Sequence, residues 1–506
     1  MACSPQTIDS RFLFFGYWQK VTLMLLFVSS VSFYCADIEI IALEPWSELK
    51  RIGLGLLTPD LFATEYLLQA VWQTISFALL GLGLGLLLGA PLAVFYHHPI
   101  VSMSCAFIRS IHELFWALLF LQIFGLSPLT GILAIGLPFG ATFARVFYDI
   151  LQQTPHDTSL SLPANTDTFS RYIYGHVVHA WAEIHAYVRY RFECALRSSA
   201  ILGFVGMPTL GFYLESAFRQ GHYHQGGALL LLFITMIATI PYWCRKSLLP
   251  FYLVACIALL PAIPSVDGSL IWRFLSHDIL PPMFQSYAAP LALEDKARLF
   301  YDWLSLLITD QALAGMVATL ILAFAALGVS YLFALALITV GCRALTGTFC
   351  AKMSQPALLV LRSIPEYILA YIFMLLLGPS MLPTIMALAI HNGALIGYLS
   401  ARQIAALNDN SHSNGRLDGY AYTILPRIYP NIMALLFYRF EVILRETAIL
   451  GMLGVVTLGF YVDSYFAEMR FNSALVLMCM TALLNMGADL LSRRLLANGS
   501  LSYRLC

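Results

Sequence analysis

The sequence predicts an all-α integral membrane protein with about twelve transmembrane helices in two parallel repeats of six spans. Apolar residues make up 59% of the 506-residue chain and charged residues only 11%, against about 25% charged in a typical soluble domain. A second observation is an internal repeat, since segments 191–216 and 439–464 are identical at sixteen of 26 positions. Arg-Ser-Ile-His-Glu at 109–113 and Arg-Ser-Ile-Pro-Glu at 362–366 keep the same order upstream. The whole unit is therefore duplicated.

The spans follow from runs of roughly 20 apolar residues, the length that crosses the hydrocarbon. We expect the first half, residues 1–245, and the second half, residues 246–506, to be two modules. The predicted spans of the first half are 20–36, 70–95, 106–124, 128–151, 192–217 and 226–243. Those of the second half are 247–262, 312–341, 357–378, 381–406, 440–463 and 473–491.

Basic residues set the orientation, because cytoplasmic loops are rich in Lys and Arg. Arg245-Lys246, Arg343 with Lys352, and Arg493-Arg494 would lie inside, together with both termini. The acid-containing segments 37–65 and 264–310 would then lie outside. The first apolar run lacks a clear cleavage site, so we expect a retained span.

Six spans return the chain to the same side, so the two halves have the same orientation. The expected symmetry is a pseudo-twofold axis along the membrane normal. A transport pathway between the two modules is the natural consequence.

Charged residues inside predicted spans recur in both halves, and such charges usually have a partner or a function. Two patterns have i,i+4 spacing, which places both side chains on one face of a helix. The charges can be read as intrahelical ion pairs or as a cationic lining for an anionic substrate. The candidates are Glu193/Arg197 with Glu441/Arg445, and Arg109/Glu113 with Arg362/Glu366.

Glycines mark the fifth predicted span of each half. This density of glycine weakens a helix and also allows helices to approach closely. We expect either close helix packing or a broken helix that lines a cavity. The positions are Gly203, Gly206 and Gly211, with their counterparts Gly451, Gly454 and Gly459.

Two long cytoplasmic segments, 152–190 and 407–438, separate the fourth and fifth spans. The second contains Gly415 and then Leu425-Pro426, and the first has Gly175 within a histidine-rich stretch. A glycine, a spacer and Leu-Pro have the form of the loop by which importer permeases dock on an ATPase. The histidines of the first segment lack the cysteine or carboxylate neighbours of a metal site, so we expect neither metal nor cofactor.

Several function classes lack support. The chain has no Gly-x-x-x-x-Gly-Lys motif for nucleotide and no catalytic His-Glu-x-x-His or Gly-x-Ser-x-Gly. It is therefore not expected to be an enzyme, and any ATP would be bound by another polypeptide. Lys plus Arg equals Asp plus Glu, so charge does not favour nucleic acid as a partner.

Two long motifs carry a family resemblance. Arg-Ser-Ile-Pro-Glu at 362–366 and the segment 438–461 resemble the permease of phosphonate ABC importers, a family that includes phosphite importers. The first half is similar at 109–113, 117–129 and 191–213. The chain departs from the family at His112, which replaces a proline, and in its first cytoplasmic segment, which lacks Leu-Pro.

The resemblance implies a type I importer permease fold in a bacterial inner membrane. It implies two separate ATP-binding subunits inside and a periplasmic substrate-binding protein outside. Because the chain resembles two fused modules, no second permease copy is expected. The resemblance implies phosphonate, phosphite or a related oxyanion as cargo, without distinguishing among them.

Two other functions compete with this interpretation. Ion-coupled secondary carriers for small anions also have parallel six-span halves, but commonly carry a long loop between spans six and seven. Here that link covers only 244–247, which favours the ABC permease. A membrane scaffold or regulator is the third option.

Overall fold

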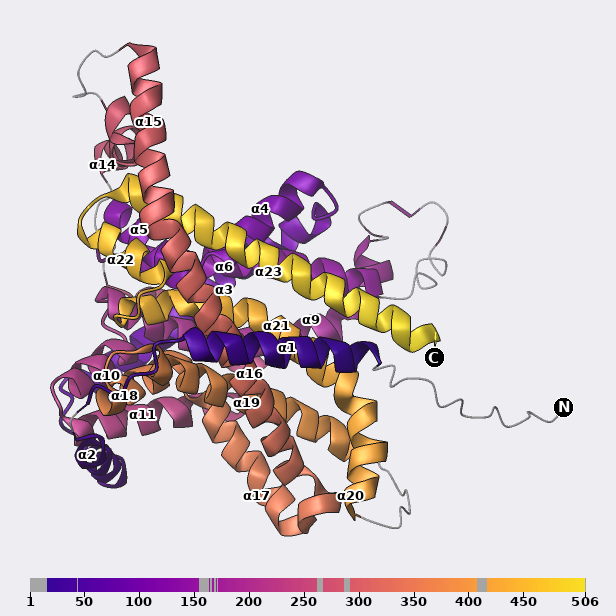
Figure 1. Cartoon of the computed structure of the whole chain (residues 1–506). Coiled ribbons are helices and arrows are strands. Elements are labelled where there is room, and N and C mark those ends of the chain that lie inside the picture. Colours follow the sequence, from indigo (N-terminus) through magenta and orange to yellow (C-terminus); the bar gives the residue numbers. More distant parts are fainter. Residues whose placement is uncertain are drawn as a thin grey trace.

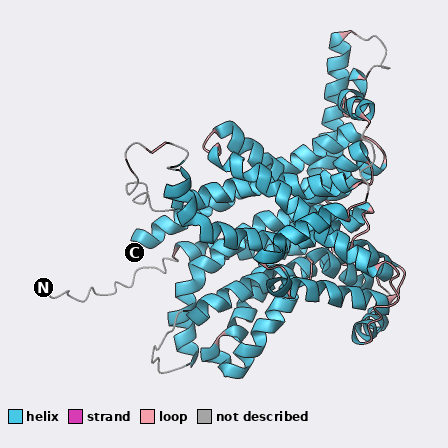
Figure 2. Ribbon diagram, turned by 180° about the vertical axis from the view of Figure 1, so that it is seen from behind, coloured by secondary structure: helices cyan, strands magenta, loops and turns pink. Residues whose placement is uncertain are grey.

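The computed structural model describes residues 16–42, 44–153, 163, 166–167, 170, 172–261, 267–285, 292–406 and 416–505. These residues form helices and connecting turns and contain no strand (Figures 1 and 2). The first half contains α1 (Tyr17–Cys35), α2 (Pro45–Leu57), α3 (Leu67–Val94), α4 (Pro99–Ser110), α5 (Glu113–Phe124), α6 (Pro128–Gln153), α9 (Val178–Ile201), α10 (Leu210–Arg219), α11 (Tyr223–Ala238) and α12 (Ile240–Trp243). The second contains α13 (Leu249–Ala258), α14 (Gly268–Arg273), α15 (Leu293–Leu307), α16 (Leu313–Gly341), α17 (Arg343–Ser363), α18 (Glu366–Leu377), α19 (Met381–Ala406), α20 (Arg416–Asp418), α21 (Leu425–Met452), α22 (Leu458–Ala467) and α23 (Phe471–Leu505).

Among the described residues, five helices are long and apolar enough to cross a membrane. The number rises to eight if each of three sharply bent helix pairs counts as one span. The predicted count of twelve is therefore not confirmed. Two predicted spans form short helices, since α11 has 16 residues and α13 has 10.

Each half is built on a pair of long helices, α3 with α6 and α16 with α19. Glycines on α3 lie against large side chains of α6, so a Cβ at Gly85 would lie 3.0 Å from the Phe139 Cβ and one at Gly89 2.5 Å from that of Phe143. Close backbone approach of this kind is the usual device for packing helices in lipid. The bent helices pack against these pairs, with α4 and α5 on α6 and with α17 and α18 on α19.

The third predicted span of each half, 106–124 and 357–378, is not one continuous helix. Helices α4 and α5 meet at 90°, and α17 and α18 at 84°. The residues at the bends, Ile111 and Ile364, have extended backbones with ψ near 130° and 122°. Pro365 disfavours a helical conformation for the residue before it. In the first half, His112 stands in place of this proline and caps the start of α5. Its Nδ1 accepts a hydrogen bond from the Leu114 amide at 3.1 Å.

The fifth span is also broken, at the glycines. Helix α9 ends in a short 3₁₀ turn, Leu202–Val205, and Gly206 has φ of +89° before α10 begins. Gly454 has φ of +99° at the equivalent place between α21 and α22. Thr74 on α3 accepts a hydrogen bond from the Leu210 amide at 2.9 Å, and Thr319 on α16 does the same for Leu458 at 3.1 Å. The elbow thus has the same construction in both halves.

The segments predicted as cytoplasmic loops are partly helical. Helices α9 and α21 begin at Val178 and Leu425, well before the predicted starts at 192 and 440. A single wide π-type turn precedes each of them, at Ile173–Val177 and at Gly419–Ile424. These early starts were not predicted, because charged residues and histidines interrupt the first turns of α9 and prolines interrupt those of α21, so neither resembles a membrane span.

The two halves interlock through their first helices. Helix α1 of the first half packs on α16 of the second, and α13 of the second half packs on α3 of the first. After α1, the Ile41 amide donates to the Leu377 carbonyl at 2.9 Å and the Met381 amide to the Asp37 carbonyl at 2.9 Å. Each half therefore packs against the first helix of the other.

Large apolar side chains are exposed on the long helices, as expected of helices that contact lipid. On α1, Phe27 is 70% exposed, and on α3 Leu87 is 75% exposed. The start of α1 and the end of α23 lie at the same end of the bundle (Figure 1), where the Tyr17 hydroxyl donates to the Leu495 carbonyl at 2.7 Å. Helix α2 lies at the opposite end, and α15 projects from the bundle.

Candidate functional site

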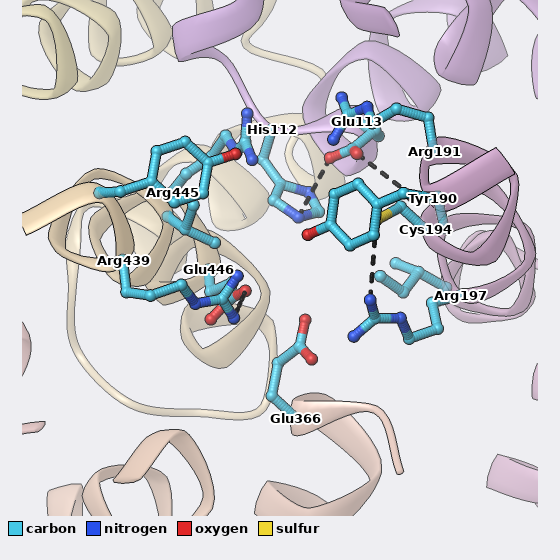
Figure 3. Close-up of a pocket in the computed structure, with 14 residues that line it drawn as sticks. His112, Glu113, Tyr190, Arg191, Cys194, Arg197, Glu366, Arg439, Arg445 and Glu446 are labelled. Carbon is cyan, nitrogen blue, oxygen red and sulfur yellow. Dashed lines mark hydrogen bonds and ion pairs between the residues drawn. The ribbon is translucent and has the colours of Figure 1, made fainter. Parts of the chain in front are cut away.

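A small polar pocket lies where the two halves meet, with a volume of about 70 Å³. Helices α9 and α21 form its two walls, and the first residues of α5 and α18 complete it (Figure 3). The lining residues are His112, Glu113, Tyr190, Arg191, Cys194, Arg197, Ser198, Ile201, Glu366, Tyr438, Arg439, Val442, Arg445 and Glu446.

The lining is made of equivalent residues from the two halves. Arg191 and Arg439 occupy the same place in the repeat, as do Arg197 and Arg445. Figure 3 shows one arginine pair on each side of the pocket. With its four arginines and three glutamates ionised, the lining has one net positive charge. This arrangement suits a small anion that is held without being trapped.

The predicted intrahelical ion pairs are not formed. Arg109 and Glu113 lie on different helices, α4 and α5, on either side of the 90° bend, and Arg362 and Glu366 are likewise separated. Glu113 instead contacts His112 at 3.3 Å and accepts from the Ser198 hydroxyl at 3.1 Å. For these two pairs the i,i+4 interpretation was wrong because it assumed a continuous helix.

The repeated charges pair across the two halves instead of within one helix. Arg109 of the first half contacts Glu441 of the second at 2.6 Å. Arg362 of the second half contacts Glu193 of the first at 3.5 Å. These two contacts are equivalent in the repeat, so the halves exchange ion pairs reciprocally. The predicted Glu193–Arg197 and Glu441–Arg445 pairs are replaced by these contacts.

The two exchanged pairs differ in distance and burial. Arg109 is 6% exposed and also contacts Asp489 of α23 at 2.7 Å. Asp489 pairs in addition with Arg145 at 3.3 Å and with Arg493. This network borders a second cavity of about 280 Å³ beside the pocket. Arg362 has the longer contact with Glu193 and stacks on the Tyr398 ring at 4.5 Å.

The other two predicted arginines, Arg445 and Arg197, contact the helix bends of the opposite half directly or through His391. Arg445 donates to the Arg109 carbonyl at the end of α4, at 3.1 Å. Arg197 lies 3.2 Å from His391 Nε2, and His391 Nδ1 lies 3.0 Å from the Ile364 carbonyl at the end of α17. The geometry fits the tautomer in which Nδ1 donates to Ile364 and Nε2 accepts from Arg197. Both arginines thus line the pocket while positioning a helix end.

Several lining or supporting residues escaped the sequence prediction of the site. Arg191 and Arg439 were visible in the repeat but lacked the i,i+4 partner used to select candidates. Asp489 lies inside a predicted apolar span and its charge was an available signal. The repeat did not select His391 and Asn392, since their equivalents in the first half are Pro138 and Phe139.

The six glycines lie at the elbow and do not line the pocket. A Cβ at Gly211 would overlap the Ala200 carbonyl oxygen, and one at Gly459 would overlap that of Ala448. At Gly203 and Gly451 the added atom would overlap the amide nitrogens of Phe212 and Phe460. The structure therefore shows a broken helix and close backbone packing at these glycines, but the glycines do not line a cavity as the second alternative expected.

The residues predicted for ATPase coupling lie around the starts of α9 and α21. Gly175 is buried within the first π-type turn, while Leu425 and Pro426 form the first turn of α21. Gly415 lies outside the described residues. Tyr174 and Tyr422 are equivalent in the repeat and are 62% and 80% exposed. Both segments thus present an exposed tyrosine on similar backbones.

Comparison with known proteins gives three curated relatives. The phosphate-import permease protein PhnE of Mycolicibacterium smegmatis is 25% identical over 443 residues, covering 79% of this chain and 80% of the relative. The phosphite transport system permease protein PtxC of Stutzerimonas stutzeri is 25% identical, over 46% of this chain and 82% of the relative. The putative phosphite transport system permease protein HtxC of the same organism is 22% identical, over 38% and 76%.

No protein-family model matches the chain, and no solved structure does so significantly. Two of the relatives align over most of their own length with less than half of this chain. This coverage agrees with the duplication seen in the sequence. The chain is accordingly similar to permeases named for phosphate import and phosphite transport.

Proposed function

We propose that this chain is the permease subunit, with two modules in one polypeptide, of an ATP-driven, binding-protein-dependent importer for a phosphorus oxyanion in a bacterial inner membrane. The observation that carries the proposal is the convergence of Arg191, Arg197, Arg439 and Arg445 on one pocket between the halves. Guanidinium groups are well suited to phosphorus oxyanions, because their fixed donors match the oxygens in pairs. The sequence has no nucleotide motif, so the energy comes from separate subunits.

The proposal assigns roles to the other predicted residues. Residues 1–245 and 246–506 act as the two modules around the pathway. Arg109, Glu113, Glu193, Arg362, Glu366 and Glu441 hold the modules together or shape the pathway. The segments around Gly175, Gly415 and Leu425-Pro426 dock on two ATPase subunits at the cytoplasmic side, where both termini also lie. A periplasmic protein delivers the cargo to the opposite side of the membrane. The short link between the halves argues against the carrier alternative.

Substitution of Arg445 tests the pathway role. Arg445→Gln is expected to lower uptake of phosphite or methylphosphonate roughly ten- to hundredfold, the effect of losing one charge-assisted hydrogen bond of about 1.5–3 kcal/mol. Arg445→Lys keeps the charge and should retain part of the uptake. The measurement is labelled oxyanion uptake in cells that carry the complete transporter, with membrane abundance determined in parallel.

Two controls accompany this measurement. Arg197→Gln changes the equivalent residue and should give a loss of similar size. Arg219→Gln changes an exposed arginine on α10, outside the pocket, and should leave uptake unchanged. Normal transport by Arg445→Gln, or failure only because the protein disappears from the membrane, would contradict the pathway role.

The composition of the complex is a separate prediction. One copy of this chain should assemble with two ATPase subunits, because each half supplies one docking segment. The mass of the purified complex, measured by light scattering with detergent correction, decides this. A stable assembly of two chains with two ATPases would rule the arrangement out.

A further inference from the structure

An apolar groove of about 400 Å³ opens on the outer surface of the second half. Helix α16 lines one side of it from Met316 to Phe324, and α23 lines the other from Met480 to Leu491. Phe440 of α21 also lines the groove and is itself buried, so it lies at the base. Both α16 and α23 belong to helices that are long and apolar enough to cross a membrane. The groove is therefore at a depth where the surrounding solvent is lipid.

The groove has the length of one lipid leaflet. Its lining residues on α23 include Met480, Leu483, Gly487 and Leu491, a spacing that places them on one face of the helix. A Cβ at Gly487 would have no neighbour within 4 Å, so the space beside this glycine is open. Met480 and Leu491 are eleven residues apart, roughly 16 Å at 1.5 Å per residue. This is about half of the roughly 30 Å hydrocarbon thickness of a bilayer.

The first half fills the equivalent place with its own side chains. Trp243 occupies the position of Leu491 in the repeat, and Phe192 that of Phe440. The Trp243 ring packs edge-on against Phe192 with centroids 5.9 Å apart, and Tyr252 of α13 packs on Trp243 at 6.1 Å. In the second half Leu491 is smaller, and α1, which packs on α16 as α13 packs on α3, contributes no described residue to the groove. The apolar group that covers this place must come from outside the chain.

A cation lies beyond one end of the groove. Arg494 follows Leu491 by three residues, about one turn further along the same face of α23, and its side chain is exposed. Within the described part of the chain it forms no ion pair, whereas the neighbouring Arg493 pairs with Asp489. Basic side chains at the end of a membrane span attract anionic lipid headgroups. The groove and Arg494 thus offer an apolar slot and a phosphate partner in line.

We infer that this groove binds an anionic phospholipid, with one acyl chain between α16 and α23 and the phosphate at Arg494. An apolar cavity of about 150 Å³ is enough to hold benzene, so about 400 Å³ holds a much longer hydrocarbon. Phe440 stands between Arg439 and Glu441 on α21. The bound chain therefore packs behind the wall that carries arginines of the polar pocket, outside the transport pathway and independently of its cargo.

The experiment measures lipid binding to the full chain purified in detergent. The probes are phosphatidylglycerol and phosphatidylcholine with identical acyl chains, and native mass spectrometry gives their dissociation constants. Wild type should bind phosphatidylglycerol roughly fivefold more tightly than phosphatidylcholine, the effect of one basic side chain on an anionic headgroup. Glycerol 1-phosphate, which carries the phosphate without acyl chains, should not compete. Thermal unfolding should shift upward with phosphatidylglycerol, because a ligand of the folded state stabilises it.

Two pairs of variants separate the groove from the cation. Leu491→Trp copies the first-half residue into the groove and should weaken binding of both lipids about tenfold or more. Leu490→Trp adds the same ring at an exposed neighbour outside the groove and should leave binding unchanged. Arg494→Gln should weaken only phosphatidylglycerol, roughly fivefold. Arg343→Gln, at an exposed arginine that begins α17, should change neither lipid.

Several results would overturn the assignment. Equal affinity of wild type for the two lipids would remove the headgroup preference, and equal effects of Leu491→Trp and Leu490→Trp would remove the groove. Competition by glycerol 1-phosphate would leave a phosphate site without an acyl chain. A dimer of the chain that Leu491→Trp dissociates would make the groove a protein interface instead. If Leu491→Trp does not accumulate in the membrane, Arg494→Gln decides, and an unchanged preference for phosphatidylglycerol contradicts the assignment.

Discussion

Gly211→Ala is expected to remove the folded protein from the membrane. The added methyl group would overlap the Ala200 carbonyl oxygen, and a backbone atom inside a packed helix cannot move aside as a flexible side chain can. Overpacking typically costs about 1–3 kcal/mol, and here about 3 kcal/mol or more is expected because the neighbour is backbone. The measurements are membrane abundance and thermal unfolding of the detergent-purified chain.

A matched glycine supplies the control. Gly487 lies inside α23 and a Cβ there would have no neighbour within 4 Å. Gly487→Ala should leave abundance unchanged and stabilise the protein by up to about 1 kcal/mol, the difference in helix propensity. Wild-type abundance and stability of Gly211→Ala would show that the elbow is looser than the structure indicates.

Arg109→Met is expected to destabilise the protein far more than Arg362→Met, although the two arginines are equivalent in the repeat. Removing Arg109 leaves Glu441 buried without its ion pair and takes one cation from Asp489. Breaking a buried ion pair costs about 3–5 kcal/mol. Arg362 has a 3.5 Å contact and more solvent access, so its loss should cost about 1 kcal/mol. The comparison is made on thermal unfolding of the two variants in the same detergent.

A double substitution separates charge from packing. Arg109→Met with Glu441→Leu removes both buried charges, and should recover much of the stability because apolar replacements of a buried pair are often neutral. Asp489 keeps Arg145 and Arg493 in that variant. Equal losses in the two single variants would show that the exchanged contacts do not differ in the way their distances and burial suggest.

The duplication in the sequence predicted much of the site. It identified equivalent residues, and the structure brings Arg197 and Arg445 to one pocket. The elbow glycines were also found in advance, because a helix that must turn and pack closely has few alternatives to glycine. Repeats are informative here because each residue is seen twice in the same role.

The partners of the charged residues could not be predicted in the same way. Helical spacing suggested that Arg109 faces Glu113, but a two-residue extended bend directs the two side chains into different contacts. The proline at 365 was a sign of this bend, since it restrains Ile364, whereas Ile111 offered only its equivalence to Ile364. Contacts such as Arg109 with Asp489 join residues 380 positions apart, and no local pattern reports them.

Because Ser198 and Glu446 differ at equivalent positions, this pocket requires two modules with different sequences. In a dimer of identical modules, every interface residue occurs twice, once on each side of the axis. A glutamate at this position would then add two carboxylates to those of Glu113 and Glu366 in one small pocket, where like charges disfavour each other's ionisation. A single polypeptide that contains both modules is released from this rule. Its axis need be only approximate, so the chain can place an acid on one side of a passage and a hydroxyl on the other.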